Sequence, residues 1–387
     1  MQIRSKLPDV GTTIFAVISR RARELGALNI GQGFPDYEID PRLGELVAAV
    51  VAAGHNQYAP MEGVAELRAV ISAKLAASYG VQVDPDRETT VTLGATESIF
   101  SAILAFVATG DEVIIFDPAY DSYEPAVRLA GGRALRLPLL LPDFRYDWDR
   151  VRASLSDRTR LIIINTPHNP SCTTASAEDL AALAELTRGR DIRVLSDEVY
   201  EHVVFDGRAH ASVLTHPELR ARSLAIFSFG KTLHATGWRV GYCVAPPELT
   251  QELRKVHQFN TFTIATPLQH AIAAYLREKP QVWRNLGSFF QAKRDRLRAA
   301  LAGSGFELPP AAGTFFQLLD FGRFARTTDL EFAEQLLTEA SIATIPLSPF
   351  YETPPRHTFV RLCIAKRDST LDEAASRLRA FAASHAR

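Results

Sequence analysis

Short, continuous apolar runs alternate with helical patterns through the middle of the chain. Because these runs are continuous, they are typical of strands that are buried on both faces of a largely parallel sheet. The runs are Thr89–Leu93, Glu112–Phe116, Leu161–Ile164, Ile192–Leu195, Leu224–Phe227 and Val240–Ala245. Helical patterns separate them, for example at Glu97–Ala108 and at Ser176–Thr187, where Ser176 and Asp179 have the spacing of an N-terminal capping pair. This alternation predicts an α/β fold.

The pattern changes at both ends of the chain. A long helix is predicted over Val282–Leu301, and after it come Thr314–Asp320, a helix at Asp329–Glu339, a short run at Ile342–Ile345, and Thr358–Ile364. These segments predict a smaller α+β unit. The first forty residues are rich in Gly, Pro and Arg, so we expect them to wrap over other parts. The predicted organisation is an N-terminal arm with part of the small domain (1–40), a large domain (41–280) and a small C-terminal domain (281–387).

Composition narrows the class of protein. The 387 residues include 43 Lys and Arg and 44 Asp and Glu, and this balance argues against a nucleic-acid or membrane-surface role. The three cysteines, Cys172, Cys243 and Cys363, lie far apart and predict a reducing compartment rather than a disulfide framework. No secretory leader, no apolar run of about 20 residues and no zinc-binding HExxH motif is visible. We therefore expect a cytoplasmic enzyme without a metal or a membrane span.

Polar and small residues follow the apolar runs. In open α/β sheets, ligands bind just beyond the carboxyl ends of the strands. The segments at these positions are GATES (94–98), DPAY (117–120), NTPHNP (165–170), SDEVY (196–200) and SFGK (228–231). A small-residue turn, an aromatic ring, an amide, a carboxylate with a nearby tyrosine, and a lysine are therefore expected to meet on one edge.

Lys231 is open to two interpretations. The sequence Gly230-Lys231-Thr232 invites comparison with a phosphate-binding P-loop, but Ala225 stands where that motif needs glycine. Lys231 is then either an exposed lysine at the start of a loop or a lysine buried beside an apolar strand. Burial lowers the pKa of a lysine, and its amine can then form a Schiff base with a carbonyl cofactor.

Three residues after neighbouring runs also have two interpretations each. Asp197 is either a helix cap or surface acid, or a buried partner that keeps a pyridine nitrogen protonated, so that the ring acts as an electron sink. Tyr200 is either a core residue or a hydrogen-bond partner for the phenolic oxygen of such a cofactor. Asn169 has the same second role, and otherwise belongs to a plain Asn-Pro turn.

Other residues suit an anion. Gly94-Ala95-Thr96 at the start of a helix offers backbone N–H groups and the positive end of the helix dipole, unless it is only a helix start. Ser228 and Arg239, which flank Lys231, offer a hydroxyl and a fixed charge to a phosphate ester.

Arg361 and Tyr120 complete the candidate residues. Arg361 lies within the apolar segment HTFVRLC, and is either a clamp for a substrate carboxylate or part of a salt bridge between layers. Tyr120 either stacks on an aromatic ring or packs in the ordinary way.

Together these segments resemble a known family. GATES, DPAYDSYEP, NTPHNPS, SDEVYEH, SFGKTLHATGWRVGY and HTFVRLC are similar to fold-type I, pyridoxal phosphate-dependent aminotransferases of class I/II, and the resemblance runs from Asn29 to Arg361. It implies a large domain with a mostly parallel seven-stranded sheet flanked by helices, plus a smaller α+β domain. IGQGFPD, NQYAP, GYCVAP and RKVHQF are similar to the methionine and kynurenine (glutamine) aminotransferases, and to the methionine type most of all.

The resemblance also implies residue roles. Lys231 would bind pyridoxal phosphate covalently, Asp197 would pair with the ring nitrogen, and Asn169 and Tyr200 with the phenolic oxygen. The other implied contacts are Gly94, Ala95, Thr96, Ser228 and Arg239 around the phosphate, Tyr120 on the ring, and Arg361, Gly33 and Asn169 at the substrate carboxylate. Tyr58 would reach the phosphate of a neighbouring subunit, which implies a homodimer. The chain departs from many relatives at Ser171-Cys172, where they have Thr-Gly.

The implied reaction is a ping-pong transamination between an amino acid and a 2-oxo acid. Phe15, Phe34 and Tyr37 either line an apolar side-chain pocket, which favours methionine or aromatic donors, or pack within the arm. A C–S β-lyase acting on cystathionine shares the cofactor and the lysine, but releases pyruvate and ammonia without an oxo acid. A cofactor-sensing regulator would need a DNA-binding unit, for which we expect no room before Ile30.

Overall fold

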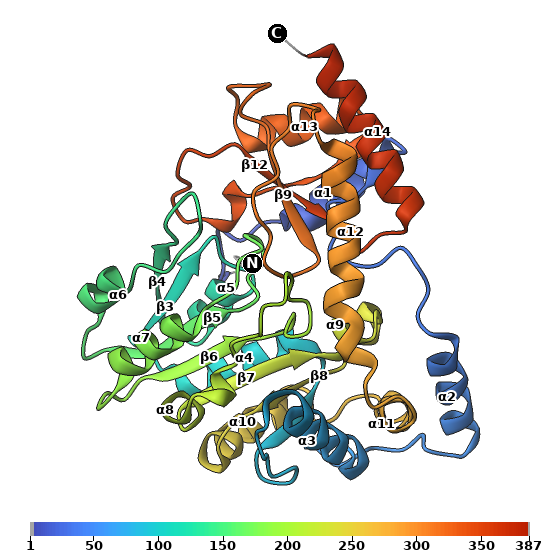
Figure 1. Cartoon of the computed structure of the whole chain (residues 1–387). Coiled ribbons are helices and arrows are strands. Elements are labelled where there is room, and N and C mark those ends of the chain that lie inside the picture. Colours follow the sequence, from blue (N-terminus) through green and yellow to red (C-terminus); the bar gives the residue numbers. More distant parts are fainter. Residues whose placement is uncertain (1–3, 386–387) are drawn as a thin grey trace.

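The structure, a computed structural model, describes residues 4–385 and contains a seven-stranded sheet with the order β2-β8-β7-β6-β5-β3-β4 (Figure 1). Its strands are β2 (Thr89–Thr92), β3 (Glu112–Asp117), β4 (Arg133–Pro138), β5 (Thr159–Asn165), β6 (Arg193–Asp197), β7 (Ser223–Ser228) and β8 (Gly241–Val244). Strands β3, β4, β5, β6 and β7 run parallel to one another, whereas β8 is antiparallel to both β7 and β2. The predicted mostly parallel sheet is confirmed.

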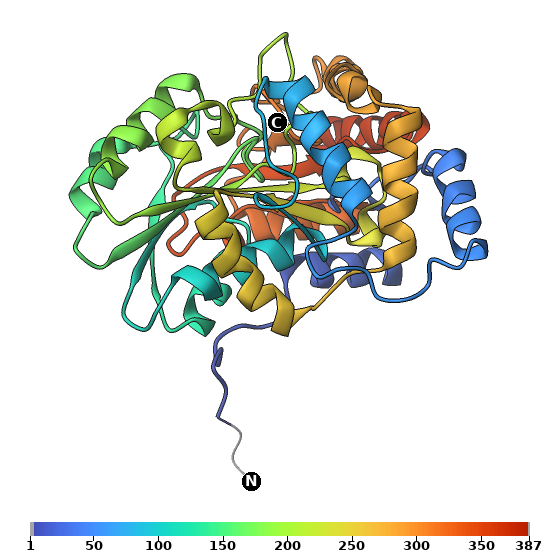
Figure 2. The same cartoon turned by 90° about the horizontal axis from the view of Figure 1, so that it is seen from below.

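Helices cover both faces of this sheet, as Figure 2 shows. One face packs on α4 (Gly94–Phe106), α5 (Tyr123–Leu129) and α10 (Pro247–Asn260). The other packs on α3 (Ala65–Tyr79), α6 (Trp148–Ser154), α7 (Ala177–Thr187), α8 (Pro217–Arg220) and α11 (Thr266–Glu278). Alternate strand residues belong to different cores, with Val113 and Ile115 on the first face and Ile114 and Phe116 on the second. This two-sided burial is why the strands read as continuous apolar runs.

A second, smaller sheet has the antiparallel order β11-β12-β9. Its strands are β9 (Phe316–Asp320), β11 (Ile345–Pro346) and β12 (Phe359–Cys363), and β1 (Leu28–Asn29) pairs in parallel with β10 (Ile342–Ala343) beside it. The helices around these strands are α1 (Ile14–Glu24), α12 (Leu286–Leu301), α13 (Asp329–Glu339) and α14 (Asp368–Ser384). Ile18 and Ala22 of α1 pack on Leu337 and Ile345, so the N-terminal segment does wrap over a distant part of the chain.

The remaining described elements are short or connect the two sheets. They are α2 (Pro41–Ala52), α9 (Phe229–Thr232), and the 3-10 turns η1 (Val213–Thr215), η2 (Thr236–Trp238), η3 (Val282–Asn285) and η4 (Ser348–Phe350). Within residues 4–385, no helix combines the length and the apolar character that crossing a membrane requires. The domain limits at residues 40 and 280 stay predictions.

Several predicted elements are confirmed and three differ. Ser176 and Asp179 form the predicted capping box, with each side chain accepting from the backbone N–H of the other. The helix predicted over Val282–Leu301 begins with the 3-10 turn η3, and the run Ile342–Ile345 divides into β10 and β11. Strand β4, at the edge of the sheet, was not predicted, because Arg133 and Arg136 interrupt its apolar run.

Candidate active site

A cavity of about 270 Å³ lies at the carboxyl edge of the large sheet. Strands β5, β6 and β7 end there at Asn165, Asp197 and Ser228. The small sheet contributes Phe316 and Arg361 from its own strands. The lining residues are Phe15, Gln32, Gly33, Ala95, Thr96, Ile99, Tyr120, Asn165, Asn169, Asp197, Val199, Tyr200, Ser228, Lys231, Arg239, Phe316 and Arg361.

The fold brings most of the predicted site residues together here. Of the thirteen candidates, eleven line the cavity, namely Gly33, Ala95, Thr96, Tyr120, Asn169, Asp197, Tyr200, Ser228, Lys231, Arg239 and Arg361. Gly94 adjoins it, because a Cβ atom added there would lie 2.5 Å from Nη2 of Arg239. Tyr58 lies elsewhere, is 83% exposed, and packs edge-on against Phe262. Phe15 lines the cavity, whereas Phe34 and Tyr37 do not.

Asp197 is buried and held in place. Its Oδ2 accepts a 2.6 Å hydrogen bond from the phenol of Tyr123, and its Oδ1 accepts a longer one, 3.4 Å, from Val199 N. Burial raises the pKa of Asp197 to about 6, although Tyr123, Val199 and the charge of Lys231 act in the opposite direction. A surface acid is therefore excluded, and the carboxylate suits a cationic partner inside the cavity.

Lys231 is not an exposed surface lysine. It lies in the single turn α9 at the end of β7, with Nζ over the rings of Tyr200 and Phe315 at 5.5 and 5.2 Å from their centroids. Burial and the nearby charge of Arg239 lower the pKa of Lys231 to about 8. The neutral, nucleophilic form of the amine is therefore reached more readily than for an exposed lysine, and it makes up about half of the population near pH 8.

Arg361 is 1% exposed and stacks between two phenyl rings. Its guanidinium carbon lies 3.8 Å from the ring centroid of Phe316 and 5.3 Å from that of Phe15. Nη1 donates to Asn169 Oδ1 at 2.6 Å and Nη2 donates to Gly31 O at 3.0 Å. Among residues 4–385, Nε has no hydrogen-bond partner and no carboxylate forms a salt bridge with the guanidinium. An interlayer salt bridge is thus excluded, and donors remain for an anionic ligand.

Two glycines, Gly94 and Gly241, leave space between the start of α4 and Arg239, and we call this space the cradle. Gly94 begins the 13-residue helix α4 with φ +71°, a conformation that glycine adopts without strain. Gly241 packs equally closely, because a Cβ atom there would lie 2.8 Å from Ala95 N. Glu97 fixes the turn by accepting from Leu93 N at 3.2 Å. The first N–H groups of α4 and the guanidinium of Arg239 therefore frame space that suits a phosphate.

The cavity lining also includes residues that were not predicted, namely Gln32, Ile99, Asn165, Val199 and Phe316, and two unpredicted residues, Tyr123 and Asn165, hold the site together. Tyr123 holds Asp197, and its position within DPAYDSYEP was the available signal. Asn165 donates to Asp197 O at 2.8 Å and accepts from Asn169 N at 2.8 Å, so it joins two strand ends to the loop that carries Asn169. Its place at the end of an apolar run could have suggested this role.

The donor set fits pyridoxal phosphate. The cradle at Gly94 and Arg239 suits its phosphate, the buried carboxylate of Asp197 suits its ring nitrogen, and the amine of Lys231 suits its aldehyde. Arg361 also lines the cavity, and the N–H groups of Nη1 and Nη2 that do not bond Asn169 and Gly31 suit a substrate carboxylate.

Comparisons with known proteins agree with this geometry. The sequence profile of the family described as aminotransferase class I and II matches residues 27–378. Methionine aminotransferase of Escherichia coli (strain K12) is 51% identical over 376 residues, which cover 97% of each chain. Kynurenine–oxoglutarate transaminase 3 of Rattus norvegicus is 32% identical over 95% of this chain and 88% of its own length.

Solved structures give the same result. The crystal structure of YbdL from Escherichia coli, which its description links to a methionine aminotransferase function, superposes with a TM-score of 0.96 at 50% identity and covers 98% of this chain and 100% of its own. N-Succinyldiaminopimelate aminotransferase from Mycobacterium tuberculosis superposes with a TM-score of 0.94 at 38% identity and covers 98% of this chain and 100% of its own.

Proposed function

The chain belongs to the class I and II aminotransferases, which depend on pyridoxal phosphate, and we propose that it transfers the amino group of a neutral L-amino acid to a 2-oxo acid. The amino acid is of the methionine or aromatic type. The observation that carries this proposal is the stacking of Arg361 between Phe15 and Phe316. A substrate whose carboxylate binds Arg361 meets two phenyl rings, which favour an apolar or aromatic side chain over a charged one.

The residue roles follow from the chemistry of each group. We assign covalent attachment of the cofactor to Lys231, its ring nitrogen to Asp197, and its phenolic oxygen to Asn169 and Tyr200. The remaining assignments are Gly94, Ala95, Thr96, Ser228 and Arg239 for the phosphate, Tyr120 for stacking on the ring, and Gly33, Asn169 and Arg361 for the substrate carboxylate. These residues belong to the proposed large domain, 41–280, except for Gly33 in the arm and Arg361 in the small domain.

Bound pyridoxal phosphate supplies an electron sink for the charge that develops when the substrate α-proton leaves. Arg361 binds and orients the substrate carboxylate through the N–H groups of Nη1 and Nη2 that do not bond Asn169 and Gly31. Lys231 Nζ, in its neutral form, would take the proton from the substrate α-carbon and, as a general acid, deliver it to the former aldehyde carbon of the cofactor. Asp197 remains ionised above about pH 6 and stabilises positive charge inside the cavity.

A half-reaction tests the substrate class. The holoenzyme is mixed with one amino acid at a time, without an oxo acid, and the visible absorbance of the bound cofactor is followed. We expect methionine and phenylalanine to convert the cofactor to its amine form faster than aspartate at equal concentration. Faster conversion by aspartate would overturn the proposed substrate class, and release of pyruvate and ammonia from cystathionine would show β-lyase activity instead.

We also propose a homodimer, supported by exposed aromatic side chains near Tyr58. Tyr58 is 83% exposed and packs edge-on against Phe262, which is 44% exposed, and both lie outside the cavity. Phe259, three residues before Phe262 in the chain, is 87% exposed. Apolar surface of this kind suits contact with another protein chain. In a second copy, Tyr58 would reach the phosphate of the neighbouring site.

Hybrid dimers test that role of Tyr58. Lys231→Ala and Tyr58→Ala subunits are each expected to have low activity. Mixed dimers contain one site with both native residues only if Tyr58 serves the neighbouring subunit, so mixing should restore activity. No gain on mixing, with mixed dimers verified by mass, would place Tyr58 in its own subunit or outside the site.

We further propose a cytoplasmic location. All three cysteines are buried and unpaired, which suits a reducing compartment. Fractionation of cells that carry the untagged chain tests this proposal, and recovery in a secreted fraction would contradict it.

A further inference from the structure

Residues 30–36 form a loop, here called the arm loop, that lies along strand β12, which carries Arg361. Ile30 O accepts from Cys363 N at 2.6 Å, and Gly31 O accepts from Arg361 Nη2 at 3.0 Å. Because Arg361 is the proposed ligand of the substrate carboxylate, the first part of the arm loop is attached directly to the proposed substrate site.

Gly33, in the middle of the arm loop, lines the cavity. A Cβ atom added to Gly33 would lie 2.7 Å from Cζ of Phe316, so its backbone packs on the same ring over which the Arg361 guanidinium lies. Among residues 4–385, the N–H group of Gly33 has no hydrogen-bond acceptor. A free N–H group at the cavity wall suits one oxygen of a carboxylate whose other oxygen binds Arg361.

Lys366 holds the arm loop directly after Gly33. This lysine lies in the turn between β12 and α14 and is 2% exposed. Its Nζ donates to Phe34 O at 2.8 Å and lies 4.7 Å from the centroid of the Phe34 ring. One residue of the loop therefore contacts Nζ twice, through its carbonyl and through its ring.

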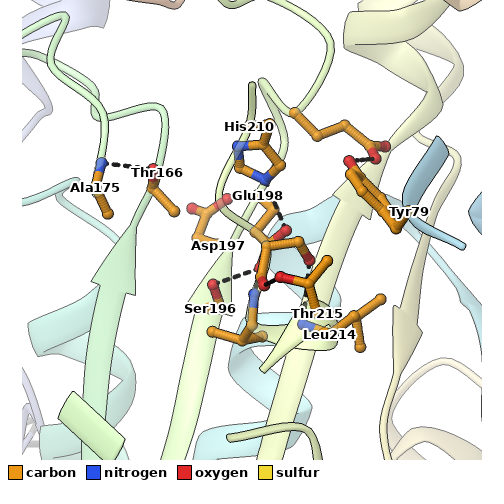
Figure 3. Close-up of polar contacts among 12 residues, drawn as sticks. Tyr79, Thr166, Ala175, Ser196, Asp197, Glu198, His210, Leu214 and Thr215 are labelled. Carbon is orange, nitrogen blue, oxygen red and sulfur yellow. Dashed lines mark hydrogen bonds and ion pairs between the residues drawn. The ribbon is translucent and has the colours of Figure 1, made fainter. Parts of the chain in front are cut away.

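Another buried lysine shows how Lys366 differs. Lys74 is 1% exposed, and its Nζ donates to the carboxylate of Glu201 at 2.6 Å. Figure 3 shows the phenol of Tyr79, which donates to the same carboxylate. Among residues 4–385, Lys366 forms no salt bridge with a carboxylate, and its Nζ donates to the arm loop instead. A buried polar group is costly unless it is hydrogen-bonded, so the contact with Phe34 accounts for a lysine at this position.

The backbone of Lys366 is itself fixed. Lys293 Nζ, from α12, donates to Lys366 O at 2.7 Å. At the far end of the arm loop, Asp36 accepts from Arg367 N at 2.6 Å. The ends of the loop therefore stay attached at Ile30 and Asp36 without the side chain of Lys366, and only the middle of the loop depends on Nζ.

We propose that Lys366 is a positioning residue for substrate binding, which holds Phe34 O so that the adjacent N–H of Gly33 stays available to the substrate carboxylate beside Arg361. The inference rests on the proposed function, in which Gly33 and Arg361 bind that carboxylate. Lys366 acts through the loop, because Nζ contacts Phe34 and the side chain does not line the cavity. It therefore affects substrate binding rather than proton transfer at Lys231.

The variant Lys366→Met tests the proposal in the holoenzyme, because methionine keeps the apolar stem of the side chain and removes the donor. The half-reaction is followed at increasing methionine concentration. The concentration that gives half the maximal rate should rise about tenfold, as expected when a hydrogen bond to a carboxylate is weakened. The maximal rate should stay close to that of the native protein, because Lys366 does not touch the reacting atoms.

A substrate without a carboxylate separates positioning from general damage. The amine 3-methylthiopropylamine has the side chain of methionine but makes no use of Gly33 or Arg361. It should react at the same rate with the native protein and with Lys366→Met. Equal losses for methionine and for this amine would overturn the inference and indicate a purely structural role. An unchanged half-saturating concentration of methionine would also overturn it.

Arg222→Met is a matched control at the opposite end of the large sheet. Arg222 directly precedes β7, and its Nη1 donates to Thr187 O at 2.7 Å and to Ile192 O at 3.2 Å. It is therefore also a basic side chain that holds backbone carbonyls. Its replacement should lower the melting temperature and leave the half-saturating concentration of methionine unchanged. A rise as large as that for Lys366→Met would contradict a specific effect through the arm loop.

The native holoenzyme gives a second measurement if Lys366→Met does not fold. A crystal structure with 4-methylthiobutanoate, which is methionine without its amino group, should show a carboxylate oxygen within hydrogen-bond distance of Gly33 N and Lys366 Nζ bound to Phe34 O. A ligand carboxylate that does not contact Gly33, or Lys366 turned away from Phe34, would overturn the inference. Native protein that does not react with methionine would instead contradict the proposed function.

Discussion

The phenol of Tyr123 donates a 2.6 Å hydrogen bond to Oδ2 of Asp197, from a position 74 residues earlier in the chain. Both side chains are buried, at 3% and 4% exposure. The bond fixes Oδ2 in place and so restricts rotation of the whole carboxylate group. It also stabilises the ionised form and thereby opposes the effect of burial on the pKa of Asp197.

Replacing Tyr123 by phenylalanine should act on the cofactor through Asp197. Loss of a hydrogen bond to a charged group should cost about 1–3 kcal/mol of unfolding free energy. The pKa of Asp197 should rise, because the phenol lowers it in the native protein. We therefore expect the absorbance midpoint of the holoenzyme, the pH at which the visible absorbance change of the cofactor is half complete, to move to higher pH. An unchanged midpoint would show that the phenol does not influence the cofactor.

The variant Gly94→Ala should weaken cofactor binding. The new Cβ atom would lie 2.5 Å from Arg239 Nη2, and φ at this position is +71°. We expect the dissociation constant of pyridoxal phosphate, measured by titrating the apoprotein, to rise about tenfold or more, which corresponds to about 1.4 kcal/mol.

Gly80→Ala is the control for Gly94→Ala. Gly80 has φ +68° at the C-terminus of α3, and no atom lies within 4 Å of its added Cβ. It carries similar backbone strain, so it should lower stability by about 1 kcal/mol and leave cofactor affinity unchanged. If Gly94→Ala and Gly80→Ala lost the same affinity for pyridoxal phosphate, the proposed phosphate site at Gly94 would be contradicted.

Arg361→Lys should impair substrate binding more than cofactor binding. Lysine retains the charge but loses the planar fork that binds a carboxylate through two parallel bonds. We expect the KM for methionine to rise about 100-fold, which is about 3 kcal/mol. The control substrate is 3-methylthiopropylamine, which lacks the carboxylate of methionine. It should react slowly, and at the same rate, with the native protein and with Arg361→Lys. A much slower reaction with Arg361→Lys would indicate that the substitution damages the site as a whole.

The apoprotein should lose stability as pH rises through the titration of Asp197. Burial raises the pKa of this carboxyl from 3.8 to about 6, so the native state binds more protons than the unfolded state between these values. Unfolding free energy should therefore fall between about pH 4 and pH 6, by up to about 3 kcal/mol. Urea unfolding of the native protein and of Asp197→Asn measures this, and the asparagine variant should lack that decrease. If the unfolding free energies of the two proteins changed with pH in the same way, the proposed effect of burial on the pKa of Asp197 would be contradicted.

Local sequence was sufficient for much of the fold. The apolar runs at Leu161–Ile164 and Leu224–Phe227 predicted strands because burial on both faces requires apolar residues at every position. Helix α13 has the predicted bounds, and its Thr328 and Glu331 form a capping box. In contrast, β4 was missed because Arg133 and Arg136 interrupt its apolar run, although Arg136 is largely buried in ion pairs with Asp117 and Glu124.

Long-range pairing limited the other predictions. The run Ile342–Ile345 reads as one apolar segment, but β10 pairs with β1 and β11 pairs with β12. The partners Leu28 and Arg361 lie far away in the sequence, so the pattern of residues 342–345 carries no information about the division.

The sequence by itself determined the α/β class, the positions of most strands, and the reactive residues at their ends, because burial and helix capping act over a few neighbouring residues. Only the tertiary structure decided that Tyr123 holds Asp197 and that the guanidinium of Arg361 lies over the rings of Phe15 and Phe316. These relationships depend on the desolvation and mutual distance of groups brought together from separate elements, and no local pattern encodes those quantities.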